Sequence, residues 1–184
     1  MAFKKRVFIF RGISGSGKST IAESIMKEEL QEIRKEESVE NELEIDKIIK
    51  YCSADDFFMI NGDYCYDYTK LSEAHDYCLE KYLEGLNSST VRILIVDNTN
   101  TETWEYSPYT ALARVFKCDI NIIEVHRDIK DCITENKHKV PVEIIKAQYK
   151  RFKPTPQALN PRIIIVGKLP NQWIKFKRWL FREI

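Results

Sequence analysis

Apolar residues along this chain follow two patterns. Short continuous runs are typical of buried strands, whereas apolar residues spaced by three or four positions predict amphipathic helices. The runs predict five strands, at residues 6–10, 48–52, 91–96, 120–125 and 162–166. The spaced pattern predicts helices that begin near residues 19, 71, 107 and 140. Because strands and helices alternate, we expect an α/β fold with a doubly wound, mainly parallel five-stranded sheet.

Three details of this pattern make specific predictions. Ser107 and Pro108 are typical of the N-cap and the first position of a helix, so the third helix is expected to begin there. His75 belongs to the apolar stripe of the helix at 71–86, which favours a buried histidine over a catalytic one. Residues 59–69 mix turn formers with tyrosines and predict an ordered loop. Its tyrosines either close the loop or stack on a base, and the first interpretation is favoured.

The composition fits a single domain over residues 1–184. With 43% hydrophobic and 31% charged residues, the chain can bury a sizeable core and is typical of a soluble globular protein. The apolar run from Val7 to Phe10 is too short for a signal peptide or a membrane span. The five cysteines contain no C-x-x-C pair, which argues against a zinc site and a disulfide framework. We therefore expect no membrane partner, and reduced thiols in the cytoplasm or nucleus.

Charge is distributed unevenly although the net charge is +1. Residues 1–100 hold 13 basic and 19 acidic side chains, whereas residues 101–184 hold 16 and 9. The basic half either faces an anionic ligand or forms a solvated surface.

The most specific motif occupies residues 12–19, which match every fixed position of the pattern G-x-x-x-x-G-K-[ST] between a predicted strand and a predicted helix. In such a loop backbone N–H groups and the helix N-terminus bind phosphate. Lys18 is then placed to reach the β- and γ-phosphates of ATP, and Ser19 to ligate Mg²⁺. The residues expected to bind ATP are Gly12, Ser14, Gly15, Ser16, Gly17, Lys18, Ser19 and Thr20.

Acidic residues follow two of the predicted strands. Asp55 and Asp56 come after the second strand, and Asp97 ends the third. Ligands of parallel sheets bind beyond the carboxyl ends of the strands, so these acids are candidate functional residues. Neighbouring residues point in different directions, and we expect Asp55 to face the phosphate site while Asp56 caps or pairs. Asp97 is expected to orient Mg²⁺ together with Ser19.

Two further segments are basic. Residues 127–140 include Lys137 and Lys139 and form either a cationic lid over the transferring phosphate or an ordinary surface connection. Residues 171–184 interleave aromatic and basic side chains. Docking of this second segment on the core is favoured over binding of single-stranded nucleic acid or a junction to a further domain.

Taken together, the phosphate loop, the pair Asp55-Asp56, the run Asp97-Asn98-Thr99-Asn100 and the pair Val140-Pro141 resemble the polynucleotide kinase-like P-loop family. The resemblance covers residues 6–152 and extends to the bacteriophage 5′-hydroxyl kinase, the CNPase kinase-like domain and, above all, the Nedd-four-binding-protein-like members of the family. It implies a P-loop kinase fold with a helical lid, and transfer of the γ-phosphate of ATP to a nucleic acid 5′ hydroxyl, with RNA somewhat favoured over DNA. Lys18 and Ser19 then match the phosphate and magnesium contacts, and Asp55 the acid that accepts the proton.

The chain departs from the family pattern twice. Phe57 and Phe58 stand where the bacteriophage kinase has an arginine for the acceptor, and Glu135 stands where the lid usually has an arginine before Asn136. Lys137, Lys139 or Arg151 would have to compensate for the second change, although a lysine does not reproduce the bidentate guanidinium.

Two other functions fit the same motifs. One is a small-metabolite or nucleoside kinase, and the other is a non-catalytic ATP-binding interaction module. A fused or associated nucleic-acid-processing domain is a further expected partner. The chain contains no pair of H-x-T motifs, so the resemblance does not extend to phosphodiesterase activity.

Overall fold

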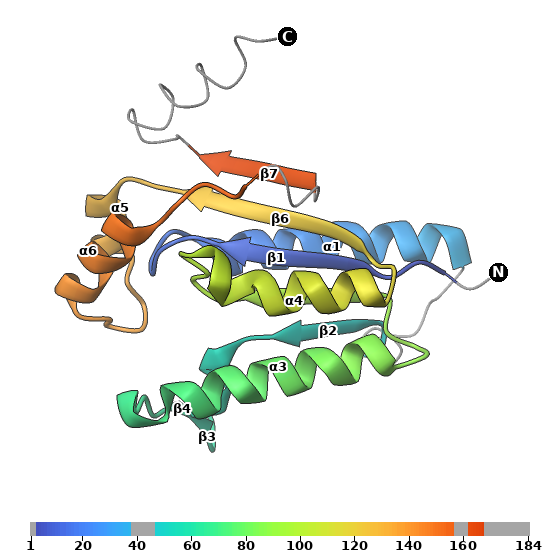
Figure 1. Ribbon diagram of the computed structural model, residues 1–184, viewed down its shortest axis with the longest axis horizontal. Coiled ribbons are helices and arrows are strands. Elements are labelled where there is room, and N and C mark those ends of the chain that lie inside the picture. The colour runs from blue at the N-terminus through green and yellow to red at the C-terminus, as the bar shows by residue number, and fades with distance from the viewer. Residues whose placement is uncertain (1–2, 38–46, 157–161, 168–184) are drawn as a thin grey trace, which may run out of the picture.

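A computed structural model of the protein describes residues 3–37, 47–156 and 162–167. In these ranges five strands form one parallel sheet in the order β2-β5-β1-β6-β7 (Figure 1). The strands are β1 Arg6–Arg11, β2 Ile49–Cys52, β5 Ile93–Asp97, β6 Asp119–His126 and β7 Arg162–Gly167. The predicted α/β fold with a five-stranded parallel sheet is therefore confirmed. All carboxyl ends of the strands lie at one edge of the sheet.

Helices cover both faces of the sheet (Figure 1). They are α1 Lys18–Glu37 on one face and α3 Leu71–Asn87 with α4 Thr103–Val115 on the other. Successive side chains of a strand point to opposite faces, so Phe8 and Phe10 pack toward α1 while Val7 and Ile9 pack toward α3 and α4. Burial on both faces explains why the central strands are continuous apolar runs.

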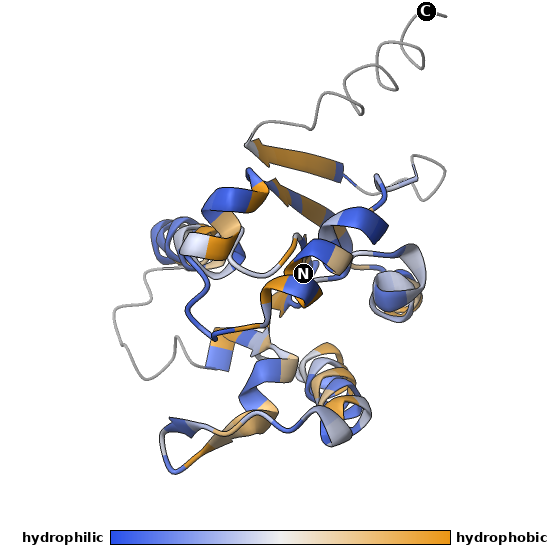
Figure 2. Cartoon of the chain, turned by 90° about the vertical axis from the view of Figure 1, so that its left-hand side faces the viewer, coloured by the Kyte–Doolittle hydropathy of each residue, from blue (hydrophilic) through white to orange (hydrophobic). Residues whose placement is uncertain are grey.

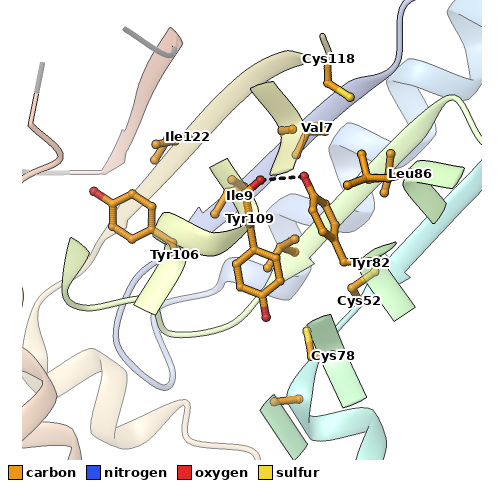
Figure 3. Close-up of a cluster of buried hydrophobic side chains, with 14 of the residues drawn as sticks. Val7, Ile9, Cys52, Cys78, Tyr82, Leu86, Tyr106, Tyr109, Cys118 and Ile122 are labelled. Carbon is orange, nitrogen blue, oxygen red and sulfur yellow. Dashed lines mark hydrogen bonds between the residues drawn. The ribbon is translucent and has the colours of Figure 1, made fainter. Parts of the chain in front are cut away.

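The layer between the sheet and the two helices α3 and α4 contains buried tyrosines (Figure 3). Tyr82 is fully buried, and its hydroxyl donates to the carbonyl of Tyr109 at 3.1 Å. Its polar atom is therefore satisfied, which avoids the cost of an unpaired buried hydroxyl. Around it, fully buried aliphatic side chains such as Ile9 and Leu94 each stabilise the fold by roughly 1.5–3 kcal/mol.

Helix α4 begins earlier than the sequence indicated. It starts at Thr103 because Glu102 and Glu105 form a capping box at its N-terminus. Pro108 therefore lies inside the helix and has no N–H to donate to Trp104, but the Ser107 hydroxyl donates to that carbonyl at 3.2 Å. The prediction that the helix starts at the Ser107-Pro108 pair is wrong.

The segment after β2 contains more regular secondary structure than the ordered loop that was predicted. It contains the 3-10 helices η1 Ala54–Phe58 and η2 Tyr68–Lys70, and between them the hairpin of β3 Met59–Ile60 and β4 Asp63–Tyr64. Asn61 and Gly62 connect the two strands with φ of 53° and 92°, the conformation that an Asn-Gly turn favours. His75, on the neighbouring helix, is exposed, so its predicted burial is wrong.

The lid segment contains α5 Ile129–Thr134, and α6 Val142–Arg151 follows it. Figure 2 looks onto the carboxyl edge of the sheet, where both helices lie. Ile13 of the phosphate loop packs in a small cluster with Cys132 of α5, Ile145 of α6 and Phe152. The two helices therefore rest directly on the predicted phosphate loop.

Two expectations concern other parts of the chain. The basic and aromatic segment 171–184 lies outside the described residues. Of the helices that are described, none is long and apolar enough to cross a membrane.

Candidate nucleotide and acceptor site

The phosphate loop connects β1 to α1. Gly15 and Gly17 have φ of 77° and 94°, which L-residues other than glycine rarely adopt. A Cβ on Gly12 would lie 2.6 Å from the Ser16 hydroxyl, whereas a Cβ on Gly17 would meet nothing within 4 Å. The Gly12 N–H donates to the Thr99 carbonyl at 2.9 Å and fixes the start of the loop on the end of the neighbouring strand. Close packing therefore requires glycine at position 12, and backbone conformation requires it at position 17.

Lys18 bends back over its own loop. Its ammonium donates to the Ile13 carbonyl at 3.1 Å. Burial lowers the pKa of Lys18, and the carboxylates of Asp97 and Asp55 oppose this shift. Lys18 is therefore close enough to both candidate acids to be affected by their charge.

Asp97 lies where β5 ends and is buried. Its Oδ2 accepts hydrogen bonds from Ser19 at 2.7 Å and from Tyr51 at 2.5 Å. Burial and the neighbouring Asp97 raise the pKa of the Tyr51 phenol, so this tyrosine stays a neutral donor. The sequence prediction paired Ser19 with Asp97 as possible metal ligands and missed Tyr51. The signal available for Tyr51 was its position near the end of β2, the strand that pairs with β5.

The residues around Asp97 suit a magnesium ion bound to ATP. Its Oδ1 is buried and has no hydrogen-bond partner among the described residues. No group of three or more His, Cys, Asp or Glu side chains that could hold a metal occurs in the described part of the chain. Mg²⁺ commonly binds one or two protein oxygens and completes its shell with phosphates and water. Ser19 and Asp97 fit that pattern and would hold the ion, which would supply charge neutralisation at the phosphates.

Asp55 and Asp56 point to different partners. Ser53 caps η1: its hydroxyl accepts from the Asp55 N–H at 3.2 Å and donates to the Asp97 carbonyl at 3.0 Å. Asp55 Oδ1 accepts from the Tyr64 hydroxyl at 2.9 Å, whereas Asp56 pairs with Lys81 at 2.6 Å. Asp56 thus forms the pairing expected for one of the two acids, and Asp55 lies near Lys18 and the hairpin.

The loop between α5 and α6 carries the two predicted lid cations. Asn136 donates to the Val140 carbonyl at 2.6 Å and accepts from its N–H at 3.0 Å, which closes the loop at its base. Lys137, His138 and Lys139 are exposed between these residues. The rings of His138 and Tyr64 lie 4.7 Å apart, centroid to centroid. This contact joins the lid to the β3–β4 hairpin.

The remaining lid charges have other partners. Glu135, which stands in place of the family's arginine, lies 3.7 Å from Arg127. The Arg151 side chain donates to the Thr101 hydroxyl at 2.8 Å and lies 3.6 Å from Glu105, so it holds α6 to the start of α4. This engagement leaves Lys137 and Lys139 as the better candidates for the missing lid cation.

The phosphate loop also contacts α5 and α6 through its backbone. The Ser14 N–H donates to the Gln148 side-chain oxygen at 2.9 Å. A Cβ on Gly15 would lie 2.0 Å from the Cys132 carbonyl, so α5 packs directly on this glycine. Sequence reasoning missed Gln148, because nothing in a helical stripe marks a side chain that binds a distant loop. Of the other predicted nucleotide contacts, Ser16 is buried and Thr20 is exposed.

A buried ion pair lies behind the loop. Arg11 ends β1 and pairs with Glu124 of β6 at 2.8 Å, and both are almost fully buried. Burial alone would raise the pKa of Glu124, but hydrogen bonds to His126 and Thr155 and the charge of Arg11 lower it to about 2. Arg11 also donates to the carbonyls of Asn100 and Lys153 at 2.8 Å. The pair therefore ties the strand ends to the segment after α6, and no pattern in the sequence indicates it.

Residues 7–155 match a family model described as an AAA domain. NEDD4-binding protein 2 of Homo sapiens is 29% identical over 162 residues, which cover 84% of this chain and 8% of that protein. The chain thus spans less than a tenth of the length of this curated relative.

Solved structures share the fold at low identity. A putative kinase from Chloroflexus aurantiacus has a TM-score of 0.61 at 13% identity and covers 99% of this chain and 98% of its own. The APS kinase CysC of Mycobacterium tuberculosis, solved in complex with AMPPNP and APS, has a TM-score of 0.51 at 15% identity, with 98% and 99% covered. These similarities show a P-loop kinase fold.

Proposed function

Because the chain belongs to the AAA domain family over residues 7–155 and is a P-loop kinase-like ATP-binding domain, we propose that it transfers the γ-phosphate of ATP to the 5′ hydroxyl of a polynucleotide. The observation that carries the proposal is the placement of Asp55. Ser53 links the Asp55 N–H to the Asp97 carbonyl at the phosphate site, and the Asp55 carboxylate binds Tyr64 of the exposed hairpin. An acceptor hydroxyl that reaches Asp55 from the hairpin side therefore comes close to the phosphate that Lys18 would hold.

In the proposed reaction the acceptor hydroxyl donates a hydrogen bond to Asp55, which orients its oxygen toward the γ-phosphate. The new P–O bond forms as the bond to the β-phosphate oxygen breaks, and ADP leaves. Phosphoryl transfer passes through a loose transition state, so Asp55 mainly positions the hydroxyl and accepts its proton late. Lys18 neutralises charge on the phosphate oxygens.

The positive charges of the lid loop favour a nucleic acid over an uncharged small molecule as the acceptor. Lys137 and Lys139 are exposed on either side of His138, whose ring contacts Tyr64, the residue bound to Asp55. Neither lysine forms an ion pair with a described residue. Two cations next to the residue that contacts Tyr64 suit the phosphodiester groups that follow a 5′ hydroxyl.

The test supplies ATP labelled on its γ-phosphate together with 5′-hydroxyl RNA and DNA oligonucleotides, free nucleosides, or buffer alone. We expect the oligonucleotides to be labelled, with RNA somewhat favoured. Asp55→Asn should reduce kcat by about 10³-fold. The matched control is Asp56→Asn, because Asp56 pairs with Lys81 and should change kcat less than tenfold.

Three outcomes contradict the proposal in different ways. Labelling of nucleosides alone would identify a small-acceptor kinase. ATP binding without labelling of any acceptor would identify a non-catalytic interaction module. Oligonucleotide labelling that is the same in Asp55→Asn as in the wild type would remove Asp55 from the reaction.

A further inference from the structure

Aromatic side chains gather on the acceptor side of Asp55. We call Phe58, Tyr64, Tyr66 and His138 the acceptor-side aromatic cluster. The ring of Phe58 lies 6.2 Å from that of Tyr64 and 5.0 Å from that of Tyr66, edge-on in both cases. Tyr64 and Tyr66 are nearly parallel, with planes 16° apart and centroids 6.4 Å apart. His138 reaches Tyr64 from the lid at 4.7 Å.

Burial within the cluster decreases from Phe58 outward. Phe58 is 3% exposed and belongs to the main core, Tyr64 is half-buried, and Tyr66 is 54% exposed. Packing of the hairpin on η1 accounts for Phe58 and Tyr64, because the ring of Tyr64 in β4 contacts the ring of Phe58 in η1. It does not account for Tyr66, which presents an aromatic ring to solvent while contacting Phe58 and Tyr64. Because Phe58 and Tyr64 hold the Tyr66 ring in place, little side-chain freedom is lost when a ligand stacks on its exposed face.

The cluster lies at the correct place for the base of an acceptor nucleotide. The Tyr64 hydroxyl donates to Asp55 Oδ1, so the ring is attached directly to the carboxylate that would hold the 5′ hydroxyl. In a nucleotide one ribose separates that hydroxyl from the base. A nucleotide with its hydroxyl on Asp55 therefore brings its base to the tyrosine rings.

We propose that Tyr66, supported by Tyr64 and His138, stacks on the unpaired base of the acceptor's 5′-terminal nucleotide. This inference rests on the proposed function and adds a base-binding subsite to it. The phosphates that follow the terminal nucleotide then lie toward Lys137 and Lys139, which flank His138. Stacking requires a free base face, so the subsite selects single-stranded ends over ends whose terminal base is paired.

The experiment measures kcat/KM for three oligonucleotides of one sequence with a 5′ hydroxyl: a single strand with a normal terminal base, a single strand with an abasic terminal sugar, and a blunt duplex. The wild type should favour the normal single strand over the other two by about tenfold, the size of one stacking interaction. Tyr66→Ala should bring the ratio between the normal and abasic ends to about one, and Tyr66→Phe should keep it, because the ring is retained.

The matched control is Tyr68→Ala. Tyr68 lies two residues further along the same segment, is 78% exposed and has no ring contact among the described residues, so its loss should leave the ratio unchanged. A direct measurement uses 2-aminopurine as the terminal base. Its fluorescence should fall when the wild type binds the oligonucleotide and should fall much less with Tyr66→Ala.

The outcomes separate this inference from the proposed function. If the wild type labels the normal and abasic single strands equally well, the subsite is wrong while the polynucleotide kinase activity stands. If the wild type labels free nucleosides as well as the normal single strand, the base is recognised without a polynucleotide, and the phosphate part of the proposal is wrong. If the wild type labels no oligonucleotide, both proposals fail. If Tyr66→Ala still favours the normal over the abasic single strand by the wild-type ratio of kcat/KM, the proposed role of Tyr66 is wrong.

Discussion

The two halves of the site are built differently. On the donor side, Asp97 and the Arg11–Glu124 pair are buried toward the ends of central strands. Hydrogen bonds fix the phosphate loop to the Thr99 carbonyl and, through Ser19, to Asp97. On the acceptor side, Asp55 lies on a short 3-10 helix, and its neighbours are a two-residue-per-strand hairpin and an exposed lid loop.

The difference has a physical consequence. Strand ends held by a parallel sheet keep the same geometry whatever the substrate, so the donor half is fixed by the fold. Side chains on short exposed elements change without cost to the core, so we expect the proposed acceptor half to decide the substrate. This is why similarity to kinases of low identity shows the fold of this chain and leaves its acceptor to be tested.

The largest expected effect is loss of the donor half's cation. Lys18→Ala should lower transfer by about 10³-fold, because charge on the transferring phosphate is no longer neutralised. The free energy of unfolding should change little, since burial already disfavours the Lys18 charge. Steady-state kinetics and urea unfolding check this. The control is Lys27→Ala, because Lys27 lies on the exposed face of α1. If Lys18→Ala has the same turnover as the wild type, the assignment of the phosphate site is wrong.

The second effect is on the stability of the donor half. Glu124→Gln leaves Arg11 buried beside a neutral amide and should lower the free energy of unfolding at pH 7 by about 3 kcal/mol. Folding lowers the pKa of Glu124 from 4.5 to about 2, so its charge contributes stability above about pH 4.5 that is lost as the pH falls to about 2. The difference in the free energy of unfolding between wild type and Glu124→Gln should therefore narrow as the pH falls from about 4.5 to about 2. Urea unfolding against pH measures it.

The control for this prediction is an exposed pair of the same charges. Glu143 lies 3.0 Å from Lys146 on α6 with 81% of its side chain exposed. Glu143→Gln should change the free energy of unfolding by less than about 1 kcal/mol, because solvent screens such pairs. If the difference in the free energy of unfolding between wild type and Glu124→Gln stays constant from pH 7 to pH 2, folding does not shift the pKa of Glu124.

The smallest effect concerns the acceptor half. Lys137→Ala or Lys139→Ala should weaken oligonucleotide binding a few-fold and reduce the slope of log affinity against log salt by about 0.7 for each lysine that contacts a phosphate of a single strand. Lys146→Ala, whose lysine pairs with Glu143, is the matched control. Titrations at several salt concentrations check this, and an affinity independent of salt would show that phosphates are not contacted.

Much of the donor half could be predicted from the sequence. The phosphate loop, the five strands and the Ser19–Asp97 pairing follow from continuous apolar runs that end in glycine or acidic residues. The predicted resemblance to the polynucleotide kinase-like P-loop family is confirmed by the family match and by the similarity to NEDD4-binding protein 2. Such local patterns are readable because the strand, loop and helix are adjacent in the chain.

The acceptor half was less predictable. The Asn61-Gly62 dipeptide was a hairpin signal that the prediction of a loop did not use, and the start of α4 was misplaced because Pro108 was given more weight than the capping box at Glu102. His75 was predicted buried from its spacing, although the packing of α3 leaves that position exposed. The roles of Asp55, Lys137 and Lys139 remain predictions.

The sequence alone is enough to place a phosphate loop between a strand and a helix and to show that acidic residues follow two of the strands. The partners of these acids depend on the packing of the whole chain: Asp56 pairs with Lys81, while Asp55 accepts a hydrogen bond from Tyr64. The tertiary structure alone brought His138 to Tyr64, Gln148 to Ser14 and Glu124 to Arg11. The reason is distance along the chain: each of these contacts joins residues whose pairing depends on how strands and helices pack, which no local pattern encodes.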